Sequence, residues 1–350
     1  MSGYIGRDKI ALGDNVGVSW GNKLIALRWE KNFLSSLVSN STAFAGDYFY
    51  DNLFKTKTTD LILNSSISNY GLKQDFQYYK NNRNTIGFGF NSIYYVTNPQ
   101  IFFQNNNNSL KNNEKGGLEN AIYFNLDRKV NANFYLDIGM RFSAYTIVNA
   151  ATKNYFDDNQ IAQTPTNNKS RTYLNAEPRI TGSYLLGKQS SMKLAYSRNV
   201  QNLHLLNNAN ISDQWILNSY KILPELSDQL SLGWENWINN KLYQVNIDVY
   251  YKYLQNQLDF KEGIGLNSIV DYESVVAKGI GRAYGLEVKL SKNSGLFSGW
   301  ISFESIYPQI ELCWRGTLWW RNMEDNEPTF HQQSSIGLPG GGRGLRNKCI

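Results

Sequence analysis

Hydrophobic and polar residues alternate with a period of two along much of this chain. The alternation is clearest in the stretch 131–146, where one set of alternate positions is apolar: Phe134, Leu136, Ile138, Met140, Phe142 and Ala144. The positions between them are mostly polar or small: Tyr135, Asp137, Gly139, Arg141, Ser143 and Tyr145. Because successive side chains of a strand point to opposite faces, this pattern predicts a long β-strand with one apolar and one polar face.

The stretch from Leu226 to Phe303 repeats this plan. An apolar set alternates with a polar set in residues 243–251, and the pattern returns at residues 284–290 after a long polar insert. Within this stretch, the strand through Leu230 and Trp234 is joined to residues 243–251 by a tight turn, 238–241. We therefore predict antiparallel strands that are joined by short turns at one side and by long loops at the other.

The same pattern predicts about twelve long strands along the chain. The first is expected at Val16–Glu30, with a bulge at Gly21, and the last is expected to end near Phe303. Four long loops are expected between pairs of strands that share a tight turn: 98–116, 148–171, 200–225 and 255–278. Strands much longer than the ~5 to 6 residues of a soluble sandwich, with short turns at one rim and long loops at the other, are typical of transmembrane β-barrels. We predict an all-β fold, namely a segment of an antiparallel transmembrane β-barrel, or an open curved sheet if the segment stands alone.

Composition and charge narrow the classes of protein. The net charge of +6 comes from basic residues that are spread singly along the chain, so we expect no nucleic acid as a partner. No apolar run approaches the ~18 to 20 residues of a transmembrane helix. The first residues, 1–14, lack the basic start and apolar core of a signal peptide, so we expect either a cytoplasmic protein or an internal piece of a longer precursor.

Catalytic chemistry finds little support in the sequence. The two histidines, His204 and His331, have no partners in sequence for a triad or a metal site, and we interpret His204 as a surface residue without a ligand role. The glycines of 279–285 enter a predicted strand rather than a helix, so they are not a dinucleotide loop. Cys313 and Cys349 form no disulfide or zinc framework. We expect no enzyme, no cofactor and no metal.

Six charged residues fall on the polar faces of predicted strands and are the candidates for a site: Arg141, Glu177, Arg179, Asp248, Glu287 and Lys289. In a barrel that face lines the lumen, where these side chains would meet a substrate or a plug. The alternative is that they form ordinary solvated charge ladders across the inner wall, and for any single residue that alternative is favoured.

With these residues in hand, the chain resembles the β-barrel of TonB-dependent outer-membrane receptors. The order and spacing of several short motifs across residues 172–303 carry the resemblance: Leu174–Ile180, Ala195–Asn199, Leu203–Leu206, Leu226–Gln229, Val249–Lys252, Gly281–Glu287 and Gly299–Ser302. Weaker similarity extends back to about Asp14. The resemblance implies a barrel of about 22 strands in the outer membrane, closed by a plug domain, that imports siderophores, vitamins, saccharides or peptides with energy relayed by TonB. Its partners would be outer-membrane lipid, the nutrient and, through the plug, the TonB complex.

The chain departs from that family pattern in three ways. No plug precedes the strands, about ten strands are missing, and the strand pattern stops after Glu304. We therefore expect a partial barrel in residues 1–304 and an irregular tail in residues 305–350, which is frame-shifted or disordered, and we expect the fragment alone to be unable to transport. Two alternatives stay open: a plugless porin-like or adhesin-type barrel, and a soluble carbohydrate-binding β-domain.

Overall fold

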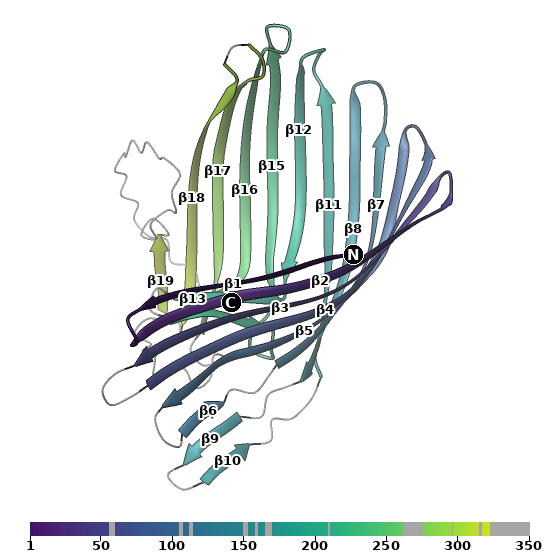
Figure 1. Ribbon diagram of the computed structural model, residues 1–350. Helices are drawn as coiled ribbons and strands as arrows, with labels where there is room; N and C mark the ends of the chain where they lie inside the picture. The colour runs from purple at the N-terminus through teal and green to yellow at the C-terminus, as the bar shows by residue number, and fades with distance from the viewer. Residues whose placement is uncertain are drawn as a thin grey trace.

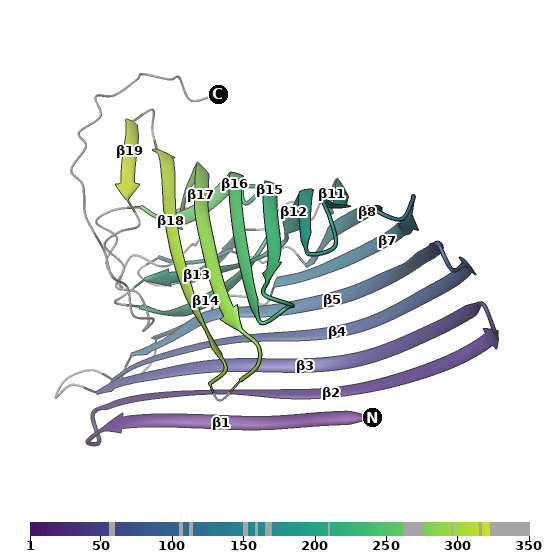
Figure 2. The same ribbon diagram turned by 90° about the horizontal axis from the view of Figure 1, so that it is seen from above.

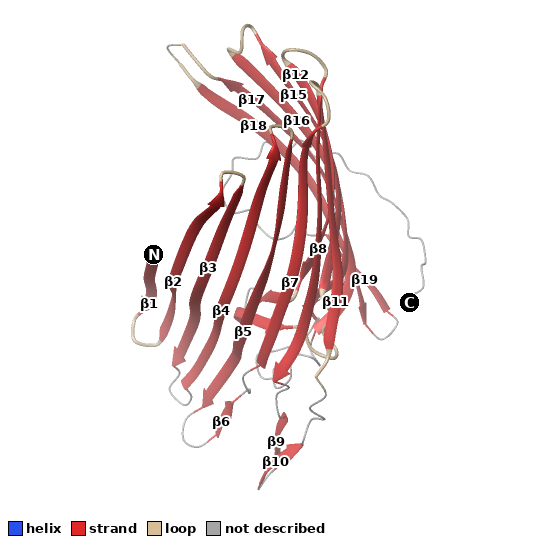
Figure 3. Ribbon diagram, turned by 90° about the vertical axis from the view of Figure 1, so that its right-hand side faces the viewer, coloured by secondary structure: helices blue, strands red, loops and turns tan. Residues whose placement is uncertain are grey.

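The computed structural model describes residues 1–55, 60–104, 108–111, 115–149, 153–157, 160–164, 170–208, 211–261, 276–295, 297–314 and 317–322. Every regular element among them is a β-strand (Figure 3). No helix in the described part of the chain is long and apolar enough to cross a membrane. The predicted all-β fold class is confirmed.

The strands differ widely in length, and the longest have about twenty residues. In chain order they are β1 (Ser2–Leu12), β2 (Val16–Leu34), β3 (Leu37–Lys55), β4 (Asp60–Asn81), β5 (Asn84–Gln104), β6 (Asn108–Lys111), β7 (Lys115–Lys129), β8 (Phe134–Asn149), β9 (Lys153–Asp157), β10 (Gln160–Thr164), β11 (Thr172–Leu185), β12 (Ser190–Gln201), β13 (Leu203–Asn208), β14 (Ile211–Leu217), β15 (Glu225–Ile238), β16 (Tyr243–Phe260), β17 (Val276–Lys292), β18 (Gly299–Trp314) and β19 (Thr317–Asn322).

One large antiparallel sheet contains most of these strands. Its order is β1-β2-β3-β4-β5-β7-β8-β11-β12-β15-β16-β17-β18-β19, with β6 added to β5, while β9–β10 and β13–β14 form two separate hairpins. The sheet curves strongly, and in the described part of the chain it stays open between β1 and β19 (Figure 1). This arrangement agrees with the predicted barrel segment in its open, curved form.

Continuous register gives the sheet one apolar face, which we call the outer face. A single row of paired positions runs across it from β5 to β18: Ile86, Leu126, Ile138, Ile180, Tyr196, Leu230, Tyr251, Tyr284 and Tyr307. Two tyrosines of this row, Tyr284 and Tyr307, stack with ring centroids 5.4 Å apart. Most of these apolar side chains are exposed, as expected for a surface that lipid covers.

Tight turns gather at one rim of the sheet, as predicted, but the tight turn 13–15 between β1 and β2 lies at the other rim, beside Lys55. At 82–83 the side chain of Asn81 closes the turn, because its Oδ1 accepts hydrogen bonds from the backbone N of Arg83 and of Asn84, each at 2.9 Å. At 239–241 three consecutive residues have positive φ, a backbone that Asn tolerates better than most residues. The β9–β10 hairpin projects from the opposite rim (Figure 3).

The structure corrects several predicted strand boundaries. A strand that was not predicted, β1, precedes β2, and β18 continues to Trp314 rather than ending near Phe303. The bulge predicted at Gly21 is wrong: β2 pairs regularly there, and its register shifts only between Asn32 and Leu34. Gly21 instead makes room for the ring of Phe49, because a Cβ at this position would meet that ring. The division of the chain into residues 1–304 and a tail remains a prediction.

The long connection between β12 and β15 folds back inside the sheet. There β14 contacts β3, β4, β5 and β7, and β13 contacts β16, so the hairpin lies within the curve of the sheet (Figure 2). A hydrophobic core forms where it packs on the sheet, with Tyr145, Ile147 and Leu217 at its centre. The face that the hairpin covers, opposite the apolar one, is the inner face.

Candidate functional site

The six predicted site residues share the inner face, but the structure places them in two separate regions. Arg141 lies directly opposite Glu177, and Arg179 lies opposite Gly139. On the other side of the sheet Asp248 lies opposite Glu287. The register therefore agrees with the predicted common facing, whereas the side-chain contacts of the two groups differ.

Arg141 is the centre of a compact polar cluster. Its Nη2 lies 2.7 Å from Glu119 Oε1, its Nε lies 3.1 Å from Glu177 Oε1, and its Nη1 donates to Asn91 Oδ1 at 3.1 Å. Ser143 Oγ donates a further hydrogen bond to Glu177 Oε1 at 3.0 Å. We call these five residues the arginine cluster. Planar guanidinium groups suit such a site because several N–H donors point outward in one plane.

Four neighbouring strands bring the arginine cluster together. Asn91 comes from β5, Glu119 from β7, Arg141 and Ser143 from β8, and Glu177 from β11. The carboxylate of Glu177 is almost fully covered, with a side-chain exposure of 6%, whereas Arg141 keeps 23%. One half-buried cation therefore compensates two carboxylates, and each of them depends on it.

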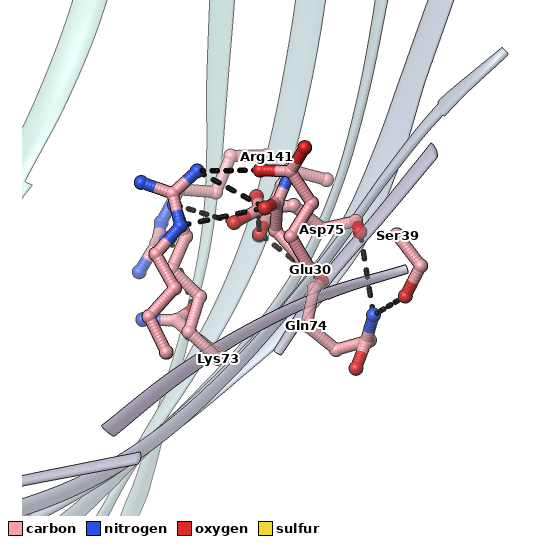
Figure 4. Close-up of polar contacts among 10 residues, drawn as sticks. Glu30, Ser39, Lys73, Gln74, Asp75 and Arg141 are labelled. Atoms are coloured by element: carbon pink, nitrogen blue, oxygen red, sulfur yellow. Dashed lines mark hydrogen bonds and ion pairs between the residues drawn. The ribbon is translucent and has the colours of Figure 1, made fainter. Parts of the chain in front are cut away.

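A second ionic group lies on the same stretch of wall (Figure 4). Lys73 Nζ is 3.1 Å from Asp75 Oδ2, and Tyr123 OH donates to Asp75 Oδ1 at 2.6 Å. Tyr123 lies directly opposite Arg141 in the register of β7 and β8. Polar side chains thus follow the wall from β4 to β11 without a break.

The β13–β14 hairpin covers the arginine cluster through hydrogen bonds of its own. Asn202 Nδ2 donates to Glu119 Oε2 at 2.8 Å, and Asn218 Nδ2 donates to Asn202 Oδ1 at 2.7 Å. His204 Nε2 lies 2.6 Å from Asn218 Oδ1. The prediction that His204 is a surface residue is wrong, because the ring is 1% exposed inside this hairpin.

The wall over β16, β17 and β18 is open by comparison. Asp248, Glu287 and Glu304 lie in one row, each directly opposite the next, and all three are exposed. Lys289, one row away, lies over the ring of Trp300 at 5.3 Å. In the described part of the chain no ion pair involves these three carboxylates.

A family model now places the chain. The model described as TonB dependent receptor-like, beta-barrel matches residues 2–328. The chain belongs to the TonB-dependent receptor β-barrel family. This family comprises outer-membrane transport receptors rather than enzymes. No curated protein sequence matches the chain.

Solved TonB-dependent receptors share the fold at low sequence identity. The copper transporter OprC has a TM-score of 0.61 at 12% identity over 89% of this chain and 48% of its own. The ferric citrate transporter FecA has 0.60 at 13% identity, over 85% and 44%, respectively. The ferric-catecholate import receptor Fiu of E. coli K12, in its closed form, has 0.57 at 10% identity, over 85% and 48%. The chain thus spans about half the length of the structures that it matches.

The sequence predicts only some of the residues that form the polar cluster on the inner face of this receptor barrel. Glu119 and Asn202 were not predicted as site residues, although Glu119 occupies a polar-face position in the strand pattern. Arg179, which was predicted, donates to Asn199 Oδ1 at 3.1 Å and stands outside the arginine cluster. In the described part of the receptor barrel no group of three or more His, Cys, Asp or Glu is arranged to hold a metal ion.

Proposed function

We propose that this chain forms part of the wall and the loop-bearing rim of an outer-membrane receptor that takes up a scarce nutrient with energy relayed by TonB. The family match over residues 2–328 carries this proposal. Two features of the sheet support it: an outer face with a row of apolar and aromatic side chains from β5 to β18, and an inner face lined by charged and hydrogen-bonding side chains.

The two faces would divide the work of such a receptor. The outer face contacts membrane lipid, and pairing between strands satisfies the backbone where no water is present. The inner face and the long loops bind the nutrient. A plug domain transmits the force exerted by the TonB complex to the nutrient. We propose the open row of Asp248 and Glu287, with Lys289, as the part of the wall available to a nutrient or a plug. Arg141 and Glu177 instead hold the wall and its cover together.

The nutrient belongs to the class of siderophores, vitamins, saccharides or peptides. The structural neighbours are named for ferric catecholate, ferric citrate and copper, but identities of 10 to 13% give the fold and no ligand. Family membership favours the receptor over the porin-like or adhesin-type barrel. The exposed apolar face weighs against a soluble carbohydrate-binding domain, which would need to bury such a surface.

Orientation in the membrane is the first test. Single cysteines replace Tyr220, at the loop-bearing rim, and Lys188, in a tight turn, on a background in which Cys313 and Cys349 are serine. Intact cells are treated with a membrane-impermeant maleimide. We expect labelling of Tyr220→Cys and none of Lys188→Cys until the cells are opened. Labelling of both in intact cells, or of neither, contradicts the proposed placement.

Energy dependence is the second test. Cells that carry a complete receptor, of which this chain forms part, are supplied with a panel of radiolabelled ferric siderophores, cobalamin, oligosaccharides and peptides. At least one compound should accumulate, and accumulation should stop in a strain that lacks TonB or in the presence of a protonophore. A porin-like barrel predicts accumulation that is insensitive to both.

A further inference from the structure

Three polar residues, Ser39, Ser41 and Gln74, interrupt the apolar outer face on β3 and β4. Phe90 shares a face of β5 with Ile86 of the outer row, and it lies directly opposite Gln74. Gln74 in turn lies opposite Ser41, and Ser39 follows on the same face of β3. Figure 4 shows the side chain of Gln74 bonded to Ser39 and turned away from the arginine cluster. Polar side chains on a surface that faces lipid need partners, because hydrocarbon supplies none.

The hydrogen bonds among these residues run in one direction and leave one donor over. Ser41 Oγ donates to Gln74 Oε1 at 2.5 Å, and Gln74 Nε2 donates to Ser39 Oγ at 2.7 Å. Ser39 is 6% exposed. Among the described residues no acceptor is found for its own O–H. Because a buried donor without an acceptor is unfavourable, this position suits an acceptor that comes from outside the chain.

Lys31 brings a positive charge to the same place. It lies directly opposite Ser39 in the register of β2 and β3. Its Nζ is 5.8 Å from the centre of the Trp29 ring and 4.9 Å from that of the Phe33 ring, while none of the ion pairs within the described strands involves it. Side chains directly opposite on neighbouring strands are close enough to bind one group together. An ammonium and an O–H donor suit an anion that only accepts, such as a phosphate diester.

An apolar groove of about 530 Å³ begins beside this pair and follows β3. Ser41 and Ala43 form its floor, because they are small and lie between larger side chains of β2 and β4. The walls are exposed apolar side chains: Leu27, Trp29, Leu72 and Phe90. Ser39 is near the start of β3 at the tight-turn rim, and Ala43 lies farther from that rim. The groove therefore has a charged end at the rim and an apolar end toward the middle of the sheet.

We propose that Lys31, Ser39 and this groove form a binding site for one glycerophospholipid. Lys31 Nζ and the O–H of Ser39 bind oxygens of the phosphate, and the groove holds one acyl chain. Ser41 and Gln74 are positioning residues, because their hydrogen bonds leave the O–H of Ser39 free for the ligand. The lipid belongs to the periplasmic leaflet, and only this choice of leaflet rests on the orientation proposed above.

Photo-crosslinking tests the site. A complete receptor, of which this chain forms part, is purified in detergent and freed of lipid. It is titrated with dioleoyl phosphatidylglycerol that carries a diazirine in one acyl chain, and crosslinked residues are located by peptide mass spectrometry. We expect crosslinks at low lipid concentration to concentrate on Leu27, Ala43 and Leu72. Crosslinks spread evenly over the outer face would overturn the proposal.

Competition separates a phospholipid site from its two parts. Glycerol 3-phosphate has the phosphate without the chains, and dioleoylglycerol has the chains without the phosphate. Each should compete about tenfold more weakly than unlabelled dioleoyl phosphatidylglycerol, since each lacks either the apolar burial or the charged hydrogen bond. Competition by glycerol 3-phosphate as strong as that of the whole lipid would reduce the site to an anion site. Equal competition by dioleoylglycerol would reduce it to an apolar groove, and either result would overturn the proposal.

Lys31→Gln tests the phosphate contact. The lipid concentration for half-maximal crosslinking should rise about tenfold, as expected for the loss of a hydrogen bond to a charged group. Arg128→Gln is the matched control, because Arg128 is an exposed cation on the same face and rim that lies opposite Leu136 and no hydroxyl. No rise in Lys31→Gln, or an equal rise in Arg128→Gln, would overturn the proposed contact.

Ala43→Leu tests the groove while Lys31 and Ser39 stay in place. The larger side chain fills the floor, so crosslinking at Leu27 and Leu72 should fall about fivefold or more. Ala176→Leu makes the same change at another exposed position of the outer face, opposite Phe142, and should leave it unchanged. Urea unfolding shows that each variant is folded. Unchanged crosslinking in Ala43→Leu would overturn the proposal.

These measurements are made in detergent and do not depend on the orientation of the barrel in the membrane. If the maleimide test contradicts the proposed placement, the crosslinks still report the site and only the leaflet changes. If the crosslinks fail while the maleimide test succeeds, the lipid site is wrong and the proposed function stands.

Discussion

Two regions of the same inner wall use similar residues in different ways. In the arginine cluster, between β5 and β11, the charged side chains are paired, half-buried or buried, and lie beside the β13–β14 hairpin. From β16 to β18 Asp248, Glu287 and Glu304 face one another in a row, exposed and without an ion pair in the described part of the chain. In both regions the sequence shows the same alternation of apolar and polar residues. The cover, rather than the strand pattern, decides whether a charge on this wall is structural or available.

The largest expected effect is the loss of Arg141. Arg141→Ala leaves Glu119 and Glu177 as buried carboxylates without their cation, which should cost about 3 to 5 kcal/mol in free energy of unfolding. Lys289→Ala on the open wall should stay within about 0.5 kcal/mol. Urea unfolding in vesicles, followed by tryptophan fluorescence, measures both. Similar losses for the two variants would erase the distinction between the covered and the open wall.

The second prediction tests which side chains point to lipid and which point to the lumen. The same assignment applies to both regions, because they share one outer face. Val249→Arg places a charge in lipid and should cost about 2 to 4 kcal/mol, whereas the neighbouring Asp248→Arg points to the lumen and should cost little. Ile138→Arg and Asp137→Arg make the same pair in the covered region. The yield of protein in the outer membrane reports the difference, and equal yields within a pair would refute the assigned facing.

Substitution of one glycine in each region tests how freely the neighbouring aromatic side chains can move. A Cβ at Gly117 would meet the ring of Tyr145, which is fully buried under the hairpin, and a Cβ at Gly285 would meet that of Tyr250, which is only partly buried. Gly117→Ala should therefore destabilise by about 1 to 3 kcal/mol, as overpacking does. Gly285→Ala should cost less, because the ring of Tyr250 is only partly buried. The midpoints of urea unfolding decide, and a larger loss for Gly285→Ala would contradict the comparison.

The smallest effect concerns the carboxylate row itself. Like charges directly opposite on neighbouring strands repel, so Glu287→Gln should stabilise by about 0.2 to 1 kcal/mol at low salt. The gain should shrink as salt rises, because exposed charges are screened. Unfolding midpoints at two salt concentrations measure it. A gain that does not depend on salt would point to a cause other than repulsion in the row.

The strands and their facing could be predicted because burial in lipid leaves a period of two in the sequence. The strand β1 left no such trace: its alternate positions are Ile5, Arg7 and Lys9 on one face and Tyr4, Gly6 and Asp8 on the other, so neither face is apolar. Expected loops also contain strand ends. The residues of β5 beyond Thr97 include three consecutive apolar residues, Ile101, Phe102 and Phe103, so they pair through their backbone without a period of two in the sequence.

The covered site was less predictable. Arg141 and Glu177 could be proposed from their polar-face positions, but their pairing depends on the register of three strands, which the sequence does not specify. Glu119 and Asn202 lie 83 residues apart, and nothing local marks either of them. The connection between β12 and β15 is predicted only as the loop 200–225, because its many apolar residues are irregularly spaced and do not suggest a buried hairpin.

The separation of 83 residues between Glu119 and Asn202 affects the order of folding. The hydrogen bond from Asn202 to Glu119 closes a loop that contains β8, β11 and β12, so it forms only after those strands have paired. Local hairpins with tight turns can assemble first, and the hairpin can dock only onto a wall that already exists. Until it docks, residues that are almost fully buried in the folded protein, such as Leu217 and Ile222, are open to proteases and to aggregation.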